Sequence, residues 1–231
     1  MYELYIGNKN YSSWSLRPWV LLKERGIAFR EHMKPFRYGS NWQTFREFSP
    51  SGRVPCLRDG ETVVWDSLGI AEFLAERHPG LWPSAPVARS WARCAAAEMH
   101  SGFGALRQVC TMNVGVRVRL HAQSPALQAD VSRIDELWNE GLARFGGPYL
   151  AGDQFTIVDA FYCPVAYRVR TYSMQLSGAA TQYATRLLDL PAMREWEAAA
   201  LQETFRETDH EADVLQVGTI VADYRVPEVA G

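Results

Sequence analysis

The sequence predicts an α/β domain over residues 1–79, a linker over residues 80–88, and an all-helical domain with a C-terminal tail over residues 89–231. Two observations predict this division. Short apolar strands alternate with helical periods only in the first third of the chain, which is typical of an α/β arrangement. The segment Pro79–Pro86 then carries three prolines in eight residues, as a linker does, and strand patterns fade beyond it.

The first three elements form a β-α-β unit. Tyr2–Ile6 is an apolar strand, a helix is expected from about Ser15 to Arg25, and residues 27–33 form a second strand. Proline is favoured in the first turn of a helix, where its missing N–H would have no partner, so Pro18 predicts a start near Ser15. Strands joined by a helical crossover are parallel. We therefore expect a parallel pair at the start of the domain.

A short helix, a hairpin and a longer helix complete the α/β domain. An aromatic face that includes Trp42 predicts a helix within residues 38–48. The Asp59-Gly60 pair lies between two apolar runs, which is a strong signal for a β-hairpin. The last helix of the domain opens at Asp66-Ser67 and ends near His78.

Beyond the linker, the apolar residues recur at helical spacing. Valine alternates with arginine over Val114–Leu120, which suits a strand locally, but the helical surroundings favour a helix there. The mixed segment from Glu207 onward is expected to be an extended tail. The four predicted helices of this domain span residues 87–110, 132–145, 156–174 and 192–205.

The turn ahead of the first helix is a candidate anion site. Ser12 and Ser13 precede the expected helix start, where free backbone N–H groups and the positive end of the helix dipole stabilise an anion. Farther along, Arg17 is expected as an exposed or ion-paired residue of the helix, with a role as a binding cation as the alternative. His210 is expected at the protein surface.

Composition argues against several function classes. The formal net charge of -2 gives no indication of a nucleic acid or an anionic membrane as partner. Apolar runs are far shorter than the roughly 20 residues of a membrane span. No basic segment followed by an apolar run marks a signal peptide, so a cytoplasmic location is expected. The four cysteines are widely separated and form no zinc spacing, so we expect reduced cysteines and no metal.

Four features in this order point to a family: the β-α-β-α-β-β-α succession, the serine-bearing turn, Val54-Pro55 before the third strand, and Asp66-Ser67 at the last helix. With the linker and the helical remainder, they resemble the cytosolic glutathione transferase family over nearly the whole chain. The element Ser12–Ser15 is most similar to the serine-type zeta and theta classes. The resemblance implies a thioredoxin-like domain followed by a helical bundle, in which Phe155–Asp159 matches the family's helix-capping box.

The resemblance also implies how a thiol would be activated. Ser12 matches the serine that hydrogen-bonds the glutathione sulfur, Ser13 is the second catalytic candidate, and Ser15 lines the same turn as a glutathione-binding residue. A free thiol, with a pKa of about 8.5, is mostly protonated at neutral pH, whereas the thiolate is the nucleophile. A hydroxyl donor and the helix dipole both favour the thiolate. Which of the three serines contacts the sulfur stays open.

The other glutathione-binding residues are implied in the same way. Val54 precedes the expected cis-proline Pro55, and its backbone would pair with the cysteinyl unit of glutathione like an added strand. Asp66 would pair with the γ-glutamyl ammonium group, while the Ser67 hydroxyl and the helix N-terminus receive the carboxylate. Arg53 is a candidate for contact with the glycine carboxylate.

An electrophilic second substrate would lie between the two domains. His100 among the candidate wall residues is equally compatible with a packing role. The residues expected to form this pocket are Tyr11, Trp14, Met99, His100, Phe103 and Arg107.

The resemblance implies a glutathione-dependent transferase that uses glutathione as co-substrate and attacks a small electrophile by conjugation or isomerisation, or reduces a peroxide. A homodimer is expected, without nucleic acid or membrane as partner. Two alternatives stay open: a non-catalytic glutathione-transferase-like interaction module, since a fold does not fix a function, and a carrier of apolar ligands.

Overall fold

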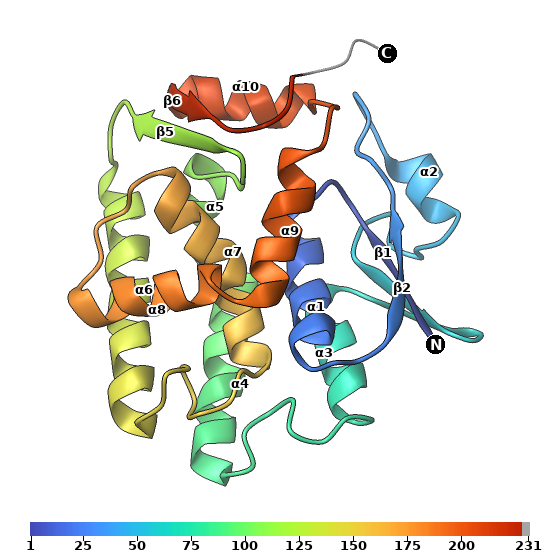
Figure 1. The fold of residues 1–231 in the computed structure, drawn as a ribbon, viewed down its shortest axis with the longest axis vertical. Helices are drawn as coiled ribbons and strands as arrows, with labels where there is room; N and C mark the ends of the chain where they lie inside the picture. Colours follow the sequence, from blue (N-terminus) through green and yellow to red (C-terminus); the bar gives the residue numbers. More distant parts are fainter. Residues whose placement is uncertain (228–231) are drawn as a thin grey trace.

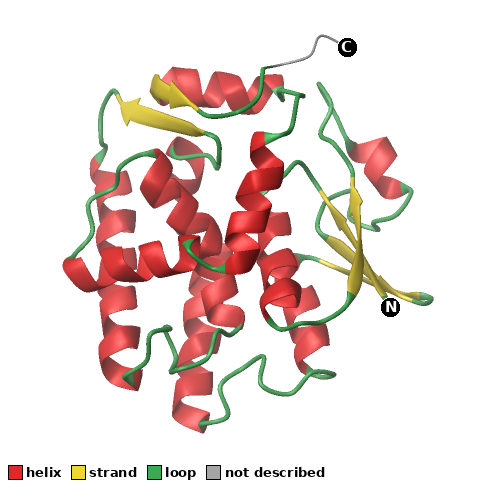
Figure 2. Cartoon of the chain, viewed as in Figure 1, coloured by secondary structure: helices red, strands yellow, loops and turns green. Residues whose placement is uncertain are grey.

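The computed structural model describes residues 1–227, in which a small mixed sheet stands beside a group of helices (Figures 1 and 2). The sheet has the strand order β2-β1-β3-β4. Strands β1 and β2 are parallel, as the β-α-β unit predicted, and β3 and β4 form the predicted antiparallel hairpin. The four strands are β1 (Tyr2–Ile6), β2 (Phe29–Met33), β3 (Cys56–Asp59) and β4 (Thr62–Trp65).

Helices cover both faces of this sheet. Helices α1 (Ser13–Glu24) and α3 (Ser67–Ala75) lie between the sheet and the helical domain, and α2 (Trp42–Arg46) lies on the other side (Figure 1). Helix α1 begins earlier than expected, because Ser12 is its N-cap and accepts the Ser15 N–H. Pro18 therefore lies inside the helix. On α2, Trp42 is 53% exposed and does not join the core.

The helical domain is organised around α7, which is buried along almost its whole length. It packs against α1, and this contact joins the domain to the sheet. The predicted capping box is confirmed at its start, where Asp159 accepts the Thr156 N–H at 2.9 Å. The predicted single helix over residues 87–110 is interrupted, because Gly102 and Phe103 leave the helical conformation. The helices are α4 (Pro86–Ser101), α5 (Gly104–Val109), α6 (Pro125–Phe145), α7 (Ile157–Thr171), α8 (Gly178–Leu188), α9 (Pro191–Leu201) and α10 (Thr208–Val217).

Two sequence expectations for this domain are wrong. Residues Val116–Leu120 form strand β5, not a helix, and pair antiparallel with β6 (Gly218–Asp223), so the domain is not all-helical. The chain from Glu207 onward is not an extended tail, because it forms α10 and then β6. The valine–arginine alternation was a strand signal, but the partner strand comes from the far end of the sequence.

The proline-rich segment between α3 and α4 is packed against the helical domain. Leu81 and Trp82 are buried, and the Leu81 carbonyl accepts the N–H of Ile157 at 3.0 Å. The expected division at residues 79 and 88 stays a prediction. Across residues 1–227, every helix is too short or too polar to cross a membrane.

Candidate active site

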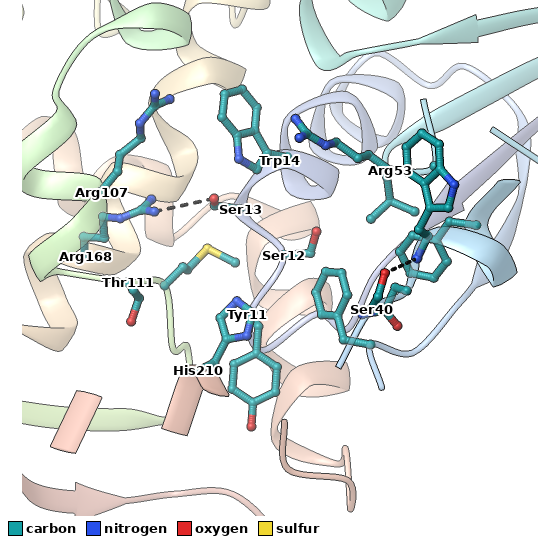
Figure 3. Close-up of a pocket in the computed structure, with 17 residues that line it drawn as sticks. Tyr11, Ser12, Ser13, Trp14, Ser40, Arg53, Arg107, Thr111, Arg168 and His210 are labelled. Atoms are coloured by element: carbon teal, nitrogen blue, oxygen red, sulfur yellow. Dashed lines mark hydrogen bonds between the residues drawn. The ribbon is translucent and has the colours of Figure 1, made fainter. Parts of the chain in front are cut away.

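A cleft between the two domains gathers most of the predicted site residues, and Figure 3 shows the larger of its two parts. Its two parts adjoin, because Trp14, Arg53 and Val54 line both of them. The first part encloses about 470 Å³ and is called here the Ser67 end; it also contains Ser51, Pro55, Trp65, Asp66, Ser67 and His100. The second encloses about 630 Å³ and is called the Arg168 end; it also contains Tyr11, Ser12, Ser13, Phe36, Ser40, Asn41, Trp42, Phe45, Gly52, Arg107, Thr111, Met112, Arg168 and His210.

Ser12 and Ser13 line the cleft at the start of α1, whereas Ser15 lies behind them. Ser12 Oγ and Ser15 Oγ are joined by a hydrogen bond of 2.7 Å, and the Gly7 N–H donates to Ser15 Oγ at 3.1 Å. Ser15 is fully buried. Its hydroxyl therefore supports Ser12 from inside the protein, rather than facing a ligand as predicted.

At the Ser67 end, Val54-Pro55 is a cis peptide bond and Asp66 is the N-cap of α3. The Asp66 carboxylate accepts the Leu68 N–H at 2.8 Å, and it lies 3.6 Å from Nε2 of His100 on α4. Asp66 has a φ of 68°, which a side-chain-bearing residue rarely adopts. Such backbone outliers are found preferentially at binding sites, where the surrounding structure holds them in place.

Arg17 lies under this end of the cleft, and its environment differs from the expected one. It is 1% exposed, so it is neither on the surface nor ion-paired; among the described residues no carboxylate forms a salt bridge with it. Its guanidinium lies 4.2 Å from the ring centroid of Trp14 and donates to Ser67 Oγ at 3.4 Å. Burial, followed by the charges of Arg168 and Arg107, lowers the pKa of Arg17 to about 9.

The Arg168 end holds two further cations from the helical domain. Arg168 on α7 is 4% exposed, donates to the Cys110 carbonyl at 2.7 Å, and reaches Ser13 Oγ at 3.5 Å. Burial lowers its pKa to about 10. Arg107 on α5 lies 5.0 Å from the Trp14 ring centroid. Within residues 1–227, neither guanidinium forms a salt bridge with a carboxylate.

Tyr11 is part of a buried hydrogen-bond network. Its phenol is bonded within this network and is not available to activate a thiol. Its phenol donates to Glu211 at 2.8 Å, and burial, together with the Glu211 charge, raises its pKa well above the usual value. Asn113 donates to the same carboxylate at 3.0 Å, and Arg225 holds it through a contact of 3.0 Å. This network fastens α10 and the segment after β6 to the start of α1.

His210 lines the Arg168 end and is not the surface residue that we expected. It lies on the first turn of α10, and Figure 3 shows its imidazole beside Tyr11, extending from the wall towards the interior of the cleft. No sequence pattern predicted this position, because α10 itself was not predicted.

The structure thus brings together Tyr11, Ser12, Ser13, Trp14, Arg53, Val54, Pro55, Asp66, Ser67, His100 and Arg107. It does not bring Ser15, Met99 or Phe103 to the wall of the cleft; Met99 and Phe103 are buried in the core. Sequence reasoning missed Arg168, although a charged residue inside the apolar stretch of α7 was a usable signal. It also missed Phe36, Trp42, Thr111, Met112 and His210 as wall residues.

Two protein-family models match parts of the chain. The model of the glutathione S-transferase N-terminal domain matches residues 11–77, and the model of the C-terminal domain matches residues 121–199; together they cover more than half of the sequence. Among curated proteins, a stringent starvation protein A homolog of Coxiella burnetii is 26% identical over 89% of this chain and 95% of its own. A probable maleylacetoacetate isomerase of Caenorhabditis elegans is 28% identical over 82% of this chain and 89% of its own.

Solved structures agree in fold. A Burkholderia glutathione transferase homolog with bound glutathione superimposes with a TM-score of 0.66 at 20% identity, covering 86% of this chain and 97% of its own. A theta class glutathione S-transferase of Xanthomonas axonopodis pv. citri, also with glutathione bound, gives a TM-score of 0.62 at 23% identity over 84% of this chain and 95% of its own. With a thioredoxin-like sheet domain, a helical domain and both family models matched, this chain belongs to the glutathione S-transferase family.

Proposed function

We propose that the protein is a cytoplasmic glutathione-dependent transferase that joins the glutathione thiolate to a small anionic electrophile by conjugation or isomerisation. The observation that carries the proposal is a cleft with two chemically different ends. One end offers a carboxylate, a hydroxyl and a helix N-terminus, and the other offers the buried Arg168 and the partly buried Arg107, neither in a salt bridge with a carboxylate of residues 1–227.

The Ser67 end suits the γ-glutamyl group of glutathione. Asp66 would pair with the ammonium group, and Ser67 at the start of α3 would receive the carboxylate. The buried charge of Arg17, which donates to Ser67, adds positive potential at the same place. Val54, before cis-Pro55, would pair its backbone with the cysteinyl unit, and Arg53 is the candidate for the glycine carboxylate.

The thiol would then lie at the start of α1. The Ser12 hydroxyl donates to Ser15 Oγ in the structure, and it would turn from this bond towards the cleft to donate to sulfur. A hydrogen bond to a charged group contributes about 1.5–3 kcal/mol, and a helix dipole about 0.3–1 kcal/mol. Both stabilise the thiolate over the thiol. The nearby charge of Arg168 acts in the same direction.

The Arg168 end suits an electrophile with a negative charge. A buried cation without a counterion is unfavourable, and the lowered pKa values of Arg17 and Arg168 report this cost. An anion that enters the cleft supplies the missing partner. The relative named as a probable maleylacetoacetate isomerase is consistent with a substrate that carries carboxylates.

Calorimetric titration with glutathione tests the proposal most directly. We expect saturable binding at millimolar or lower concentrations, and turnover of an anionic haloarene such as 4-chloro-3-nitrobenzoate. A protein that binds no glutathione at millimolar concentration would rule out the enzyme.

Replacement of each serine tests the assignment of the sulfur ligand. Ser12→Ala should raise the pKa of the bound thiol by roughly 1–2 units, which corresponds to the loss of one hydrogen bond to a charged group, while glutathione affinity changes little. Ultraviolet titration of the thiolate in the complex measures this value. A shift of that size in Ser13→Ala, with none in Ser12→Ala, would reassign the role to Ser13.

A non-catalytic interaction module is the second candidate, because several curated relatives are named stringent starvation protein A homologs, a name that states no reaction. Glutathione binding without turnover of any haloarene, alkene or hydroperoxide would favour it. We also propose a homodimer in which the sheet domain of one subunit faces the helical domain of the other. Analytical ultracentrifugation that shows a stable monomer would contradict this.

A further inference from the structure

The C-terminal segment brings a histidine and a carboxylate to the cleft that the proposed thiol activation does not use. Glu207 is the N-cap of α10, and its Oε2 accepts the backbone N–H of His210 at 2.8 Å. The same oxygen lies 2.7 Å from Nδ1 of the His210 ring. The Glu207 side chain is 5% exposed, so its carboxylate bonds His210 rather than solvent.

This pairing fixes the orientation of the ring. Because Nδ1 is bound to Glu207, the opposite nitrogen, Nε2, is the one available to a ligand. Nε2 makes no hydrogen bond with any side chain or backbone group of residues 1–227, and the side chain is 33% exposed on the wall of the cleft. A carboxylate that holds one imidazole nitrogen while the other faces a substrate is an arrangement used in acid–base catalysis.

Two aromatic rings of the sheet domain pack against the imidazole. The ring centroid of Tyr11 lies 5.1 Å away, and Phe36 is stacked at 5.7 Å with an interplanar angle of 17°. The charged groups around the ring are Glu207 behind it, the Glu211–Arg225 pair beyond Tyr11, and the arginines of the Arg168 end across the cleft. These contacts place His210 beside Tyr11, which precedes the proposed thiol-binding residue Ser12 in the sequence.

We propose that His210 donates a proton to the carbanion formed when glutathione adds to an activated carbon–carbon double bond, with Glu207 as its positioning residue. This rests on the proposed transferase function. The thiol first releases its proton to water. The sulfur–carbon bond then forms as the π bond breaks, and the electron pair moves onto the activating carbonyl as an enolate. The imidazolium transfers its Nε2 proton to the enolate carbon, and water reprotonates the ring.

A pair of anionic substrates isolates this step. Addition to 4-oxo-4-phenylbut-2-enoate needs both the thiolate and a proton donor. Substitution on 4-chloro-3-nitrobenzoate needs the thiolate but no proton donor, because chloride leaves with the electron pair. His210→Gln should lower kcat/KM for the alkene by at least about 100-fold, the lower range of general acid catalysis, and lower that for the haloarene much less, because substitution needs no proton from the ring.

Three further variants sharpen the test. Glu207→Gln, which keeps a side-chain acceptor for the His210 N–H, should reduce alkene addition alone by about tenfold. His210→Ala should recover alkene addition when imidazole is added to the buffer, which a purely structural role would not allow. His121→Gln removes a histidine at the end of β5 that bonds Thr219 outside the cleft, and both reactions should be unchanged.

The outcomes separate the two proposals. Equal losses for alkene and haloarene in His210→Gln, or no rescue of His210→Ala by imidazole, would overturn the role of His210 while the transferase stands. So would a wild-type protein that substitutes the haloarene but does not add glutathione to the alkene. A wild-type protein inert towards both substrates, and without affinity for glutathione, would overturn the proposed function itself.

Discussion

The two ends of the cleft differ in the charges that they offer to a ligand. At the Ser67 end, the Asp66 carboxylate is half-exposed and sits beside a helix N-terminus and His100, so both signs of charge are available to a zwitterionic group. At the Arg168 end, the buried Arg168 and the partly buried Arg107 line the cleft without a salt-bridged carboxylate among residues 1–227, while Glu207 is bonded to His210. The Ser67 end therefore offers charges of both signs to a ligand, with the buried Arg17 beneath it, whereas the arginines of the Arg168 end depend on a ligand for a counterion.

The largest expected effect follows from removing the charge at the Arg168 end. Arg168→Gln should lower kcat/KM for 4-chloro-3-nitrobenzoate by about 10–100-fold, since a hydrogen bond to a charged group contributes roughly 1.5–3 kcal/mol. Steady-state kinetics with the neutral analogue 1-chloro-2,4-dinitrobenzene provides the control. Its kcat/KM should change less, because it has no charge for Arg168 to pair with and reports only the loss that both reactions share through the fold, the glutathione site and the thiolate.

Comparable losses for the charged and the neutral haloarene would contradict a ligand-dependent cation at Arg168. In that case the guanidinium acts through its bond to the Cys110 carbonyl, and its role is to hold α7 against the segment after α5.

A smaller effect is expected at the Ser67 end. Asp66→Asn keeps a side-chain acceptor for the Leu68 N–H, so α3 should stay capped, but it removes the charge that would pair with the glutathione ammonium group. Glutathione affinity measured by calorimetry should fall roughly tenfold, because the partly exposed pair is weakened by solvent. The KM for the haloarene at saturating glutathione should not move. An unchanged glutathione affinity would place the ammonium group elsewhere.

The smallest effect concerns the contact that holds α10 over the cleft. Burial alone would raise the pKa of Glu211, but Arg225, Tyr11 and Asn113 lower it below the value of 4.5 that is usual for glutamate. A carboxylate with a lowered pKa stabilises the fold above its unfolded pKa, and this stabilisation is lost as the pH falls through the folded pKa. Glu211→Gln should therefore reduce the free energy of unfolding by about 1 kcal/mol at neutral pH.

Urea unfolding of wild type and Glu211→Gln at neutral pH and below about pH 4 measures this dependence. The difference between the two proteins should shrink in acid, where Glu211 becomes protonated. A difference that is constant with pH would show that the ionised carboxylate is not what stabilises α10.

Local sequence patterns were enough to predict the sheet domain and the position of the candidate site. Strand alternation, the Asp59-Gly60 turn and the serine and Asp-Ser elements are short-range patterns, and the backbone geometry that they specify is also short-range. The order of β1, α1, β2 and the hairpin, and the helix N-terminus at Asp66, could therefore be predicted from the residues, whereas α1 begins at Ser13 rather than near Ser15.

Which charged side chains face the cleft could not be predicted from these patterns, because it depends on how distant segments pack. Val116–Leu120 became a strand because Gly218–Asp223, near the other end of the chain, pairs with it. The same pairing brings α10 and His210 to the cleft, and the packing of α1 against α7 buries Arg17 and Arg168. Whether an arginine has a partner depends on residues distant in sequence, because burial and charge pairing are properties of the packed chain, whereas periodicity reports only on neighbours along it.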